Sequence, residues 1–292
     1  MKTPGAALDT LGIVIISPDR VVFPESGLTK RGLAEYYALL APEMLPDLAR
    51  RPMSLVRCPQ GRANPCFFQK HNSAAFGDHV RPFAVVEADG GTADYLYVED
   101  AAGIIACVQM GTIEFHGWGA RIDAIERPDR LVFDLDPGAG VDFAGVKAAA
   151  LLVRDALLAL GVASLPLLTG GKGIHVVVAL RPGAEWPVVR GWAKGFALEL
   201  AAAHPGVFVV TVDKAARRGR VFIDWLRNQR GATAVMPFSV RARPGAGVAM
   251  PIGWHDLGAI AAADAFSATD PAAVLAAARR RPVPVPVRLP RR

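Results

Sequence analysis

The stretch Arg130-Leu-Val-Phe-Asp-Leu-Asp-Pro-Gly138 combines an apolar strand pattern with two acids at alternate positions. Because side chains along a β-strand point alternately to opposite faces, the apolar residues would face one side of the strand. The two acids, Asp134 and Asp136, would face the other side, about 6 to 7 Å apart. A Pro-Gly pair ends the strand directly after them. The stretch predicts a buried strand whose carboxylates emerge together at the carboxyl edge of a sheet, where α/β proteins commonly bind ligands.

Two carboxylates this close repel each other unless one is protonated or a cation lies between them. Hard oxygen ligands suit Mg²⁺ or Mn²⁺. Val221-Phe-Ile-Asp224 repeats the design, because an acid again closes an apolar strand. Three acids could hold two cations, and paired cations clamp the attacking and leaving oxygens in phosphoryl and nucleotidyl transfer. The alternative is a solvated strand end with unconnected acids.

A glycine-rich turn, Thr169-Gly-Gly-Lys-Gly-Ile-His175, joins two apolar runs between the acid-bearing strands. It offers backbone N–H groups, a hydroxyl, an ammonium and an imidazole, which together suit a triphosphate. The turn differs from a Walker loop, since Gly173 follows Lys172 where Ser or Thr would stand. The alternative is a hairpin turn whose glycines only permit positive φ angles. Arginines around Asp224 would face phosphates, or else form a generic basic rim.

Hydrophobic periodicity predicts a mixed α/β chain, with Thr29 as the N-cap of a helix that ends before Pro42. The region 50–82 is rich in proline and glycine and is expected to be mostly loop. The expected strands are 13–16, 21–24, 94–98, 111–118, 131–136, 165–169, 174–180 and 220–225. The expected helices are 30 to about 40, 99–109, 142–160 and 187–204. The proline-rich end from residue 282 predicts an extended tail.

Bulk composition narrows the class of protein. Lys and Arg number 33 against 27 Asp and Glu, giving a net charge of +6, which favours a polyanionic partner such as nucleic acid or reflects solubilising charge alone. Cys58, Cys66 and Cys107 fit reduced thiols better than a disulfide framework. Irregular spacing also argues against a zinc knuckle built from cysteine and histidine. With no apolar signal region or membrane span in the sequence, a cytoplasmic, nucleoid-associated protein is expected.

Taken together, the ordered motifs resemble the polymerase domain of bacterial DNA ligase D, in the archaeo-eukaryotic primase superfamily. The resemblance covers nearly the whole chain. It implies one catalytic unit over 1–292 with two β-sheets flanked by helices. The implied parts are a DNA-end-binding lobe at about 1–110, a metal and nucleotide lobe at about 111–280, and a tail at 281–292. The motifs are Phe67-Phe68-Gln-Lys-His71, Glu114-Phe-His116, Leu131–Gly138, Thr169–His175, Val221–Trp225 and Pro237-Phe-Ser-Val-Arg-Ala-Arg243.

The resemblance assigns roles to individual residues. Asp134, Asp136 and Asp224 correspond to the family's catalytic acids, which bind two metal ions, often with a preference for Mn²⁺ over Mg²⁺. The residues that would surround the nucleotide are His116, Thr169, Gly170, Lys172, His175, Arg220 and Arg241. The DNA and its 5′-phosphate would contact Arg20, Lys30, Arg57, Phe67, Phe68 and Lys70. Phe67 and Phe68 would stack on bases without regard to sequence.

The implied activity is template-dependent addition of NTP or dNTP to a primer 3′-hydroxyl at gaps and broken ends in non-homologous end joining. The implied partners are DNA, Ku and an ATP-dependent DNA ligase, with no membrane. Alternatives are gap filling in excision repair, a non-catalytic DNA-end-binding module, and a primase that starts strands without a primer. The chain departs from the family's usual pattern in having Arg20 for Lys, Cys58 for Trp and Thr169 for Ser.

Overall fold

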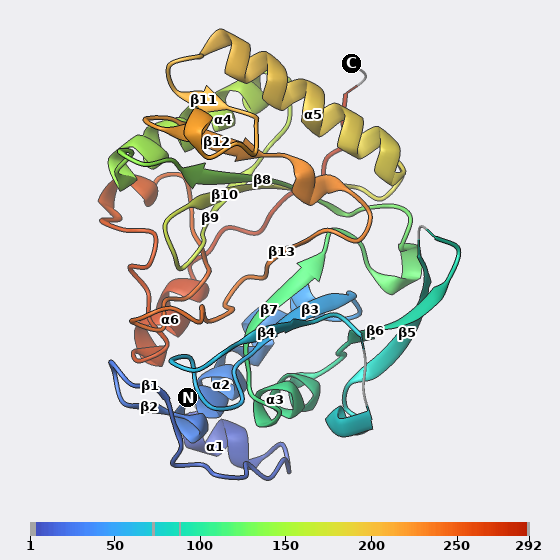
Figure 1. The fold of residues 1–292 in the computed structure, drawn as a ribbon, viewed down its shortest axis with the longest axis vertical. Coiled ribbons are helices and arrows are strands. Elements are labelled where there is room, and N and C mark those ends of the chain that lie inside the picture. The colour runs from blue at the N-terminus through green and yellow to red at the C-terminus, as the bar shows by residue number, and fades with distance from the viewer. Residues whose placement is uncertain (1–3, 72–73, 88, 291–292) are drawn as a thin grey trace. The chain divides into compact units, whose positions relative to one another are not determined.

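The computed structural model describes residues 4–71, 74–87 and 89–290 (Figure 1). The chain forms two compact units, each described by itself below. Unit 1 comprises Met1–Trp118, Val235–Ala249 and Phe266–Arg279, and unit 2 comprises Gly119–Ala234, Met250–Ala265 and Arg280–Arg292. The predicted lobes were continuous stretches, whereas the chain returns to unit 1 twice after leaving it.

The first unit contains four helices and seven strands in the described part of the chain. The helices are α1 (Pro4–Asp9), α2 (Lys30–Leu48), α3 (Ala101–Gln109) and α6 (Pro271–Ala278). The strands are β1 (Val21–Phe23), β2 (Leu28–Thr29), β3 (Met53–Arg57), β4 (Phe67–Gln69), β5 (Arg81–Val86), β6 (Thr92–Tyr97) and β7 (Thr112–Trp118). The main sheet has the order β7-β3-β6-β5, and β4 pairs with β3.

Helix α2 is the core element of unit 1. Its predicted cap is confirmed, because the Thr29 hydroxyl accepts a hydrogen bond from Gly32 N at 3.1 Å. The predicted end before Pro42 is wrong, since the helix continues through Pro42 and Pro46 to Leu48. A proline inside a helix removes a hydrogen bond, but the late residues are buried, and burial of apolar surface outweighs that loss here.

Two tyrosines of α2 explain why a late segment belongs to unit 1. Tyr36 Oη donates to Phe238 O at 2.9 Å. Tyr37 Oη donates to Ile113 O at 2.5 Å and accepts from Val240 N at 2.9 Å. Both side chains are fully buried. Segment Val235–Ala249 is therefore tied to the helix by hydrogen bonds in the core.

Two regions of this unit differ from the secondary structure predicted from the sequence. Strands β3, β4 and the start of β5 lie within 50–82, where loop was expected, because pairing in the sheet overrides weak local propensity. The strand expected at 13–16 is absent from the described structure, where Ile16 instead contacts side chains. Ile16 N donates to the side-chain oxygen Oε1 of Gln109 at 2.9 Å, not to a neighbouring strand. The predictions for 94–98, 99–109 and 111–118 are confirmed by β6, α3 and β7.

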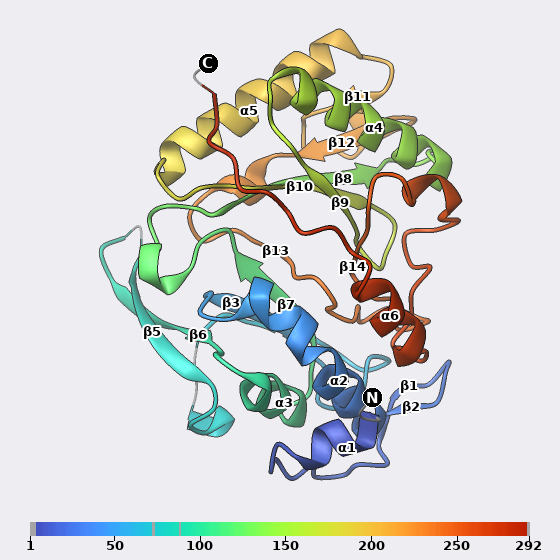
Figure 2. The same cartoon turned by 180° about the vertical axis from the view of Figure 1, so that it is seen from behind.

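The second unit contains a six-stranded sheet. Long helices cover one face of this sheet (Figures 1 and 2). The strand order is β11-β12-β8-β10-β9-β14. The helices are α4 (Phe143–Ala159) and α5 (Trp186–Ala203). The strands are β8 (Arg130–Pro137), β9 (Leu165–Leu168), β10 (Ile174–Ala179), β11 (Phe208–Val209), β12 (Val221–Asp224) and β14 (Met250–Pro251), while β13 (Thr233–Val235) lies where the chain returns to unit 1.

Pairing in this sheet is antiparallel except between β11 and β12. The helices and strands predicted from residue 131 onward are confirmed, with their ends shifted by a residue or two. The predicted mixed α/β class with two main sheets is also confirmed. The predicted tail from residue 282 is extended, but it also pairs. Val287 N donates to Ala179 O at 3.0 Å, and Arg181 N donates to Val287 O at 2.8 Å. Residues 291–292 of the tail lie outside the described residues.

Within the part of the chain that the structure describes, no helix is both long enough and apolar enough to cross a membrane.

Candidate functional site

The three predicted acids lie on one face of the unit 2 sheet. Asp134 on β8 is directly opposite Asp224 on β12 and His175 on β10. The alternate residue Phe133 points to the other face, where its ring lies 4.8 Å from that of Phe196 on α5. The acids therefore occupy the face turned away from the two helices. The expected carboxyl edge does not exist, because neighbouring antiparallel strands bring the end of β12 to the middle of β8 rather than to its end.

An arginine joins two of the acids. Arg227 Nη2 lies 3.0 Å from Asp134 Oδ2, and its Nε lies 3.1 Å from Asp224 Oδ2. On the other side, His175 Nε2 lies 3.3 Å from Asp134 Oδ1. Both oxygens of Asp134 are thus engaged by cationic or ring nitrogen groups. Sequence reasoning placed Arg227 only among nearby arginines, although its position three residues after Asp224 could have indicated the contact.

The short turn η4 (Leu226–Asn228) fixes where Arg227 lies. Leu226 N donates to Asp224 Oδ1 at 2.9 Å. Asn228 accepts from Val132 N and donates to Val132 O, both at 2.7 Å, so its buried amide continues the pairing of β8 after β12 has ended. A buried side-chain amide that satisfies two strand groups holds the turn against the sheet. No pattern in the sequence indicated this role of Asn228.

The charges of the cluster shift the pKa values of the acids in opposite directions. Burial opposes ionisation of Asp134, but the charges and hydrogen bonds of His175 and Arg227 outweigh it and lower its pKa. Burial, followed by the charge of Asp134, raises the pKa of Asp136 to about 6. Burial also raises the pKa of Asp224, although Arg227 opposes this shift. The face therefore carries more carboxylate than the guanidinium of Arg227 neutralises, and a further cation would relieve the remaining repulsion.

Whether these residues fit a metal ion can be judged from their geometry. No group of three or more His, Cys, Asp and Glu side chains among the described residues is arranged to hold one. The guanidinium of Arg227 bridges Asp134 and Asp224, where a cation shared by the two would bind. The donors themselves are the hard carboxylate oxygens that Mg²⁺ and Mn²⁺ take. The set fits a divalent cation provided that Arg227 moves away.

The glycine turn packs tightly beside the acids. Thr169 Oγ1 donates to Gly173 O at 3.0 Å and accepts from Gly173 N at 3.2 Å, and Gly170 N donates to Ala263 O at 3.0 Å. A Cβ on Gly173 would lie 2.5 Å from Leu135 O, so only glycine fits there. The Thr169 hydroxyl and two of the turn's N–H groups thus stabilise the turn itself. Their predicted role in binding a nucleotide stays a prediction.

Three more predicted nucleotide residues lie in unit 2. Lys172, at the tip of the turn, is exposed. His175 is buried, and within the described residues its Nδ1 atom has no hydrogen-bond partner. Arg220 donates to Ala216 O at 2.5 Å and so contacts a neighbouring turn rather than the acids. A buried polar atom without a partner is costly, and a bound ligand is one way to satisfy it.

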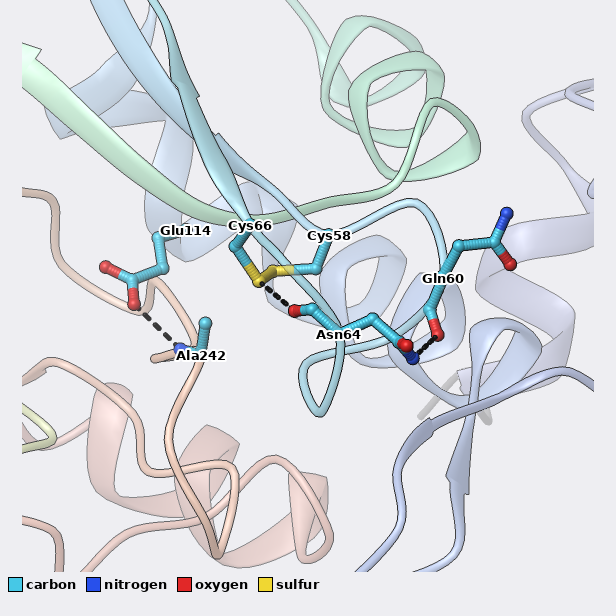
Figure 3. Close-up of a disulfide and its surroundings, with 6 residues drawn as sticks. All are labelled: Cys58, Gln60, Asn64, Cys66, Glu114 and Ala242. Carbon is cyan, nitrogen blue, oxygen red and sulfur yellow. Dashed lines mark hydrogen bonds between the residues drawn. A yellow bond between two sulfur atoms is a disulfide. The ribbon is translucent and has the colours of Figure 1, made fainter.

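The remaining two, His116 and Arg241, belong to unit 1 and meet at Glu114. Glu114 Oε2 lies 2.7 Å from His116 Nε2 and 3.0 Å from Arg241 Nε, and its Oε1 accepts from Ala242 N at 2.7 Å (Figure 3). Burial opposes ionisation of Glu114, but these partners outweigh it and lower its pKa to about 2. The ring of Phe68 lies 5.9 Å from that of His116. Glu114, which was quoted only as part of a motif, organises this cluster.

A small cavity of unit 1 gathers three of the predicted DNA-binding cations. Arg20, Lys30 and Arg57 line about 170 Å³, and no acidic side chain is among the described residues around it. Burial, followed by the charge of Arg20, lowers the pKa of Lys30. Thr112 also lines the cavity, and its buried hydroxyl has no hydrogen-bond partner within the described residues. Excess positive charge with an unsatisfied hydroxyl suits an anion such as a phosphate.

Each of the three cations of this cavity is held by a backbone carbonyl. Arg20 Nη1 donates to Pro59 O at 2.6 Å, and Lys30 Nζ donates to Ile16 O at 2.9 Å. Arg57 Nε donates to Met110 O at 2.8 Å. A carbonyl orients a cationic group without neutralising its charge. The full positive charge of the cavity is thereby kept for a ligand.

Beyond the cavity, β4 presents the predicted aromatic residues. Phe67 is 46% and Phe68 68% exposed, so part of each ring is accessible for stacking. The guanidinium of Arg57 lies 5.3 Å from the centre of the Phe67 ring. Lys70, one residue after β4, is exposed. The predicted DNA-binding residues thus lie on adjoining parts of one unit.

The prediction of three reduced cysteines is wrong for two of them. Cys58 and Cys66 form a disulfide, where reduced thiols were expected (Figure 3). The pairing of β3 with β4 brings them together, which their spacing of eight residues did not reveal. Cys107 is free and buried, as expected for a structural thiol, and burial raises its pKa.

Comparisons with known proteins identify the family to which this chain belongs. Residues 29–282 match the family model described as LigD, primase-polymerase domain. The chain is 36% identical over 262 residues to the multifunctional non-homologous end joining protein LigD of Pseudomonas aeruginosa, covering 88% of this chain and 31% of that protein. It is 33% identical over 253 residues to the LigD of Mycobacterium tuberculosis, covering 84% of this chain and 33% of that protein. The chain thus spans about a third of the length of these relatives.

A solved structure supports the same conclusion. The polymerase domain from Mycobacterium tuberculosis ligase D in complex with DNA superimposes with a TM-score of 0.83 at 29% identity, covering 92% of this chain and 99% of that one. An acid-bearing antiparallel sheet, a glycine turn beside it and a second sheet unit with a cationic cavity define a primase-polymerase type of protein. The chain belongs to the LigD primase-polymerase domain family.

Proposed function

We propose that this chain is a template-dependent nucleotidyltransferase that extends primer 3′-hydroxyls at DNA gaps and broken ends. Family membership supports the polymerase reaction. The preference for DNA ends is supported by the cavity of Arg20, Lys30 and Arg57. This cavity concentrates positive charge in a space of about 170 Å³. A terminal 5′-phosphate carries more charge than an internal one, so such a cavity favours ends over continuous backbone.

The acidic face of unit 2 would supply the chemistry. Two divalent cations, Mn²⁺ or Mg²⁺, held by Asp134, Asp136 and Asp224 would activate the 3′-hydroxyl and neutralise charge on the reacting phosphates. The chain's own part is to keep these carboxylates on one face; although burial raises the pKa of Asp136 to about 6, this carboxyl is still mostly ionised at pH 7. Arg227 would leave Asp134 and Asp224 when the cations bind. Its guanidinium would then be free to contact a phosphate.

Nucleotide binding would use groups that present positive charge or hydrogen-bond donors. In unit 2, exposed Lys172 is suited to a triphosphate, and the unpartnered Nδ1 of His175 is the atom that a ligand could satisfy. The roles of Thr169, Gly170 and Arg220 in unit 2, and of His116 and Arg241 in unit 1, remain part of the proposal.

The relatives suggest the pathway. Proteins named for non-homologous end joining share 33 to 36% identity with this chain, and the matching solved domain is in complex with DNA. We therefore propose a role in end joining, with broken DNA, Ku and an ATP-dependent ligase as partners. The stacking of Phe67 and Phe68 on bases would let the protein act on ends of any sequence.

Primer extension on a gapped duplex tests the proposal. With Mn²⁺ and both nucleotide types, the chain should extend a gap with a downstream 5′-phosphate about tenfold better than one with a 5′-hydroxyl, since a charge-assisted contact is worth roughly 1.5 to 3 kcal/mol. Lys30→Gln should remove most of this preference. Arg31→Gln is the matched control, because Arg31 is the next residue on α2 but does not line the cavity.

Two results would contradict the proposal. Equal extension of the two gaps by the unaltered protein would show that the cavity does not recognise a 5′-phosphate. An unchanged preference in Lys30→Gln would show that the recognition lies elsewhere. Product formed without any primer would favour a primase instead.

A further inference from the structure

The Cys58–Cys66 disulfide closes the hairpin that carries the predicted DNA contacts. Arg57 is opposite Phe67 in the antiparallel pairing of β3 with β4, so the next pair outward is Cys58 and Cys66. Their Cα atoms are 4.4 Å apart, which is close to the spacing of a pair without backbone hydrogen bonds in an antiparallel ladder. The bond therefore continues the ladder by one covalent rung and closes the loop of residues 59–65.

This rung lies between the two kinds of DNA contact. Cys58 lines the cationic cavity together with Arg57 and Pro59. Cys66 directly precedes Phe67, which is the first of the exposed aromatic residues. Arg57 belongs to both groups, since it lines the cavity and lies over the Phe67 ring. A change in the distance between Cys58 and Cys66 would therefore move the aromatic residues relative to the cavity.

The closed loop is also held by the cavity's own wall. Arg20 donates to Pro59 O at 2.6 Å. Arg62 N donates to Val22 O at 2.9 Å, and the Arg62 side chain pairs with Glu25. Within the loop, Asn64 Nδ2 donates to Gln60 O at 2.8 Å (Figure 3). The loop is thus hydrogen-bonded to residues of the cavity wall, and the disulfide joins its two ends.

The Cys58–Cys66 disulfide can undergo thiol–disulfide exchange through one of its two cysteines. Cys66 is exposed, whereas Cys58 is only 2% exposed. A thiolate would attack at Cys66, because this residue is the exposed one of the pair. A dithiol reductant would then break the Sγ–Sγ bond, giving the protein two electrons and two protons as two thiols while becoming a disulfide itself.

We propose that the Cys58–Cys66 disulfide is a redox-responsive positioning element that holds the aromatic strand β4 in register with the phosphate cavity for binding DNA ends. The inference rests on the proposed recognition of DNA ends. In the oxidised chain, cavity and aromatic residues are pre-organised, so less conformational freedom is lost when an end binds. In the reduced chain, β3 and β4 still pair, but the loop and its contacts to Arg20 become mobile.

Binding of gapped duplexes by the whole chain, without nucleotide, tests the inference. The dissociation constants for 5′-phosphorylated and 5′-hydroxyl duplexes are compared before and after treatment with a phosphine or dithiol reductant. Reduction should weaken binding of the phosphorylated duplex by roughly fivefold and diminish the preference for it, as expected for loss of pre-organisation. Alkylation under native conditions should label Cys58 and Cys66 only after reduction, and circular dichroism should show that the reduced chain remains folded.

The variant Cys58→Ser, Cys66→Ser provides the control. It should bind like the reduced protein, and the reductant should not change it further. An unchanged phosphate preference after confirmed reduction would overturn the inference while leaving the proposed function in place. Labelling of both cysteines in protein never exposed to reductant would also overturn it. Absence of any phosphate preference in the oxidised protein would contradict the proposed function itself, and the inference with it.

Discussion

Replacing Arg227 by glutamine should destabilise the metal-free protein and make its stability depend on a divalent cation. The guanidinium is within 3.0 to 3.2 Å of the carboxylates of Asp134 and Asp224, whose side chains are 8% and 11% exposed. Removing one partner of a buried ion pair costs about 3 to 5 kcal/mol. Because the Arg227 side chain is itself 38% exposed, we expect a lower cost, about 2 kcal/mol.

The assay is thermal unfolding with a chelator and then with excess Mn²⁺. A loss of about 2 kcal/mol lowers the melting temperature by roughly 4 to 8 °C in a domain of this size. Mn²⁺ should restore most of the loss, because a bound cation replaces the missing positive charge. The variant should also bind Mn²⁺ more tightly than the unaltered chain, since no guanidinium competes for the carboxylates.

Arg230→Gln is the matched control. Arg230 follows the same turn, but its partner Glu126 is 53% exposed, so this pair contributes about 0 to 1 kcal/mol. If Arg227→Gln loses no more stability than Arg230→Gln in the chelator, Arg227 does not neutralise the acids. If Mn²⁺ leaves the difference between the two variants unchanged, the cation and Arg227 do not share a site.

Three further predictions concern single residues. Glu114→Gln should lose up to about 3 kcal/mol of unfolding free energy at pH 7, since the pKa lowered to about 2 stabilises the fold above the unfolded value of about 4.5 and this contribution is lost only as the pH falls to 2. In urea unfolding the difference between the two proteins should fall to roughly half from pH 7 to 3, and parallel curves would contradict this expectation. Mn²⁺ affinity measured by calorimetry should fall about tenfold between pH 7 and 5, because protons compete for Asp136, with its pKa of about 6, and a flat profile would exclude Asp136 as a ligand. Asn228→Ala should cost about 2 to 4 kcal/mol in urea unfolding by leaving both backbone groups of Val132 unpaired, whereas a loss below about 0.5 kcal/mol would show that the turn is held by other contacts.

The acidic face shows what a sequence pattern can and cannot predict. Alternation along β8 correctly placed Asp134 and Asp136 on one face, because that property is local to a strand. The partners of Asp134 depend on register between strands that are distant in sequence. Antiparallel pairing brings Asp224 and His175 opposite it, and the turn after β12 brings Arg227. A local pattern contains none of this information, so the expected edge site became a site on the face of the sheet.

The errors in unit 1 have a related cause. The helix α2 passes through Pro42 because its far end is buried, and burial is a tertiary property. Strands β3 and β4 were read as loop for the same reason, and with their pairing the Cys58–Cys66 disulfide was missed. The cationic cavity was predicted only through family resemblance. Its residues come from β1, α2, β3 and β7 regions that no periodicity connects.

Single-turnover primer extension in Mn²⁺ by the double variant Asp134→Ala, Asp136→Ala tests the proposal that Asp134, Asp136 and Asp224 hold the cations for nucleotidyl transfer. Extension should fall to the background level while the variant still binds a 5′-phosphorylated gapped duplex, because the cavity of Arg20, Lys30 and Arg57 lies in the other unit. Extension by the variant at an undiminished rate would contradict the assignment of the metal site.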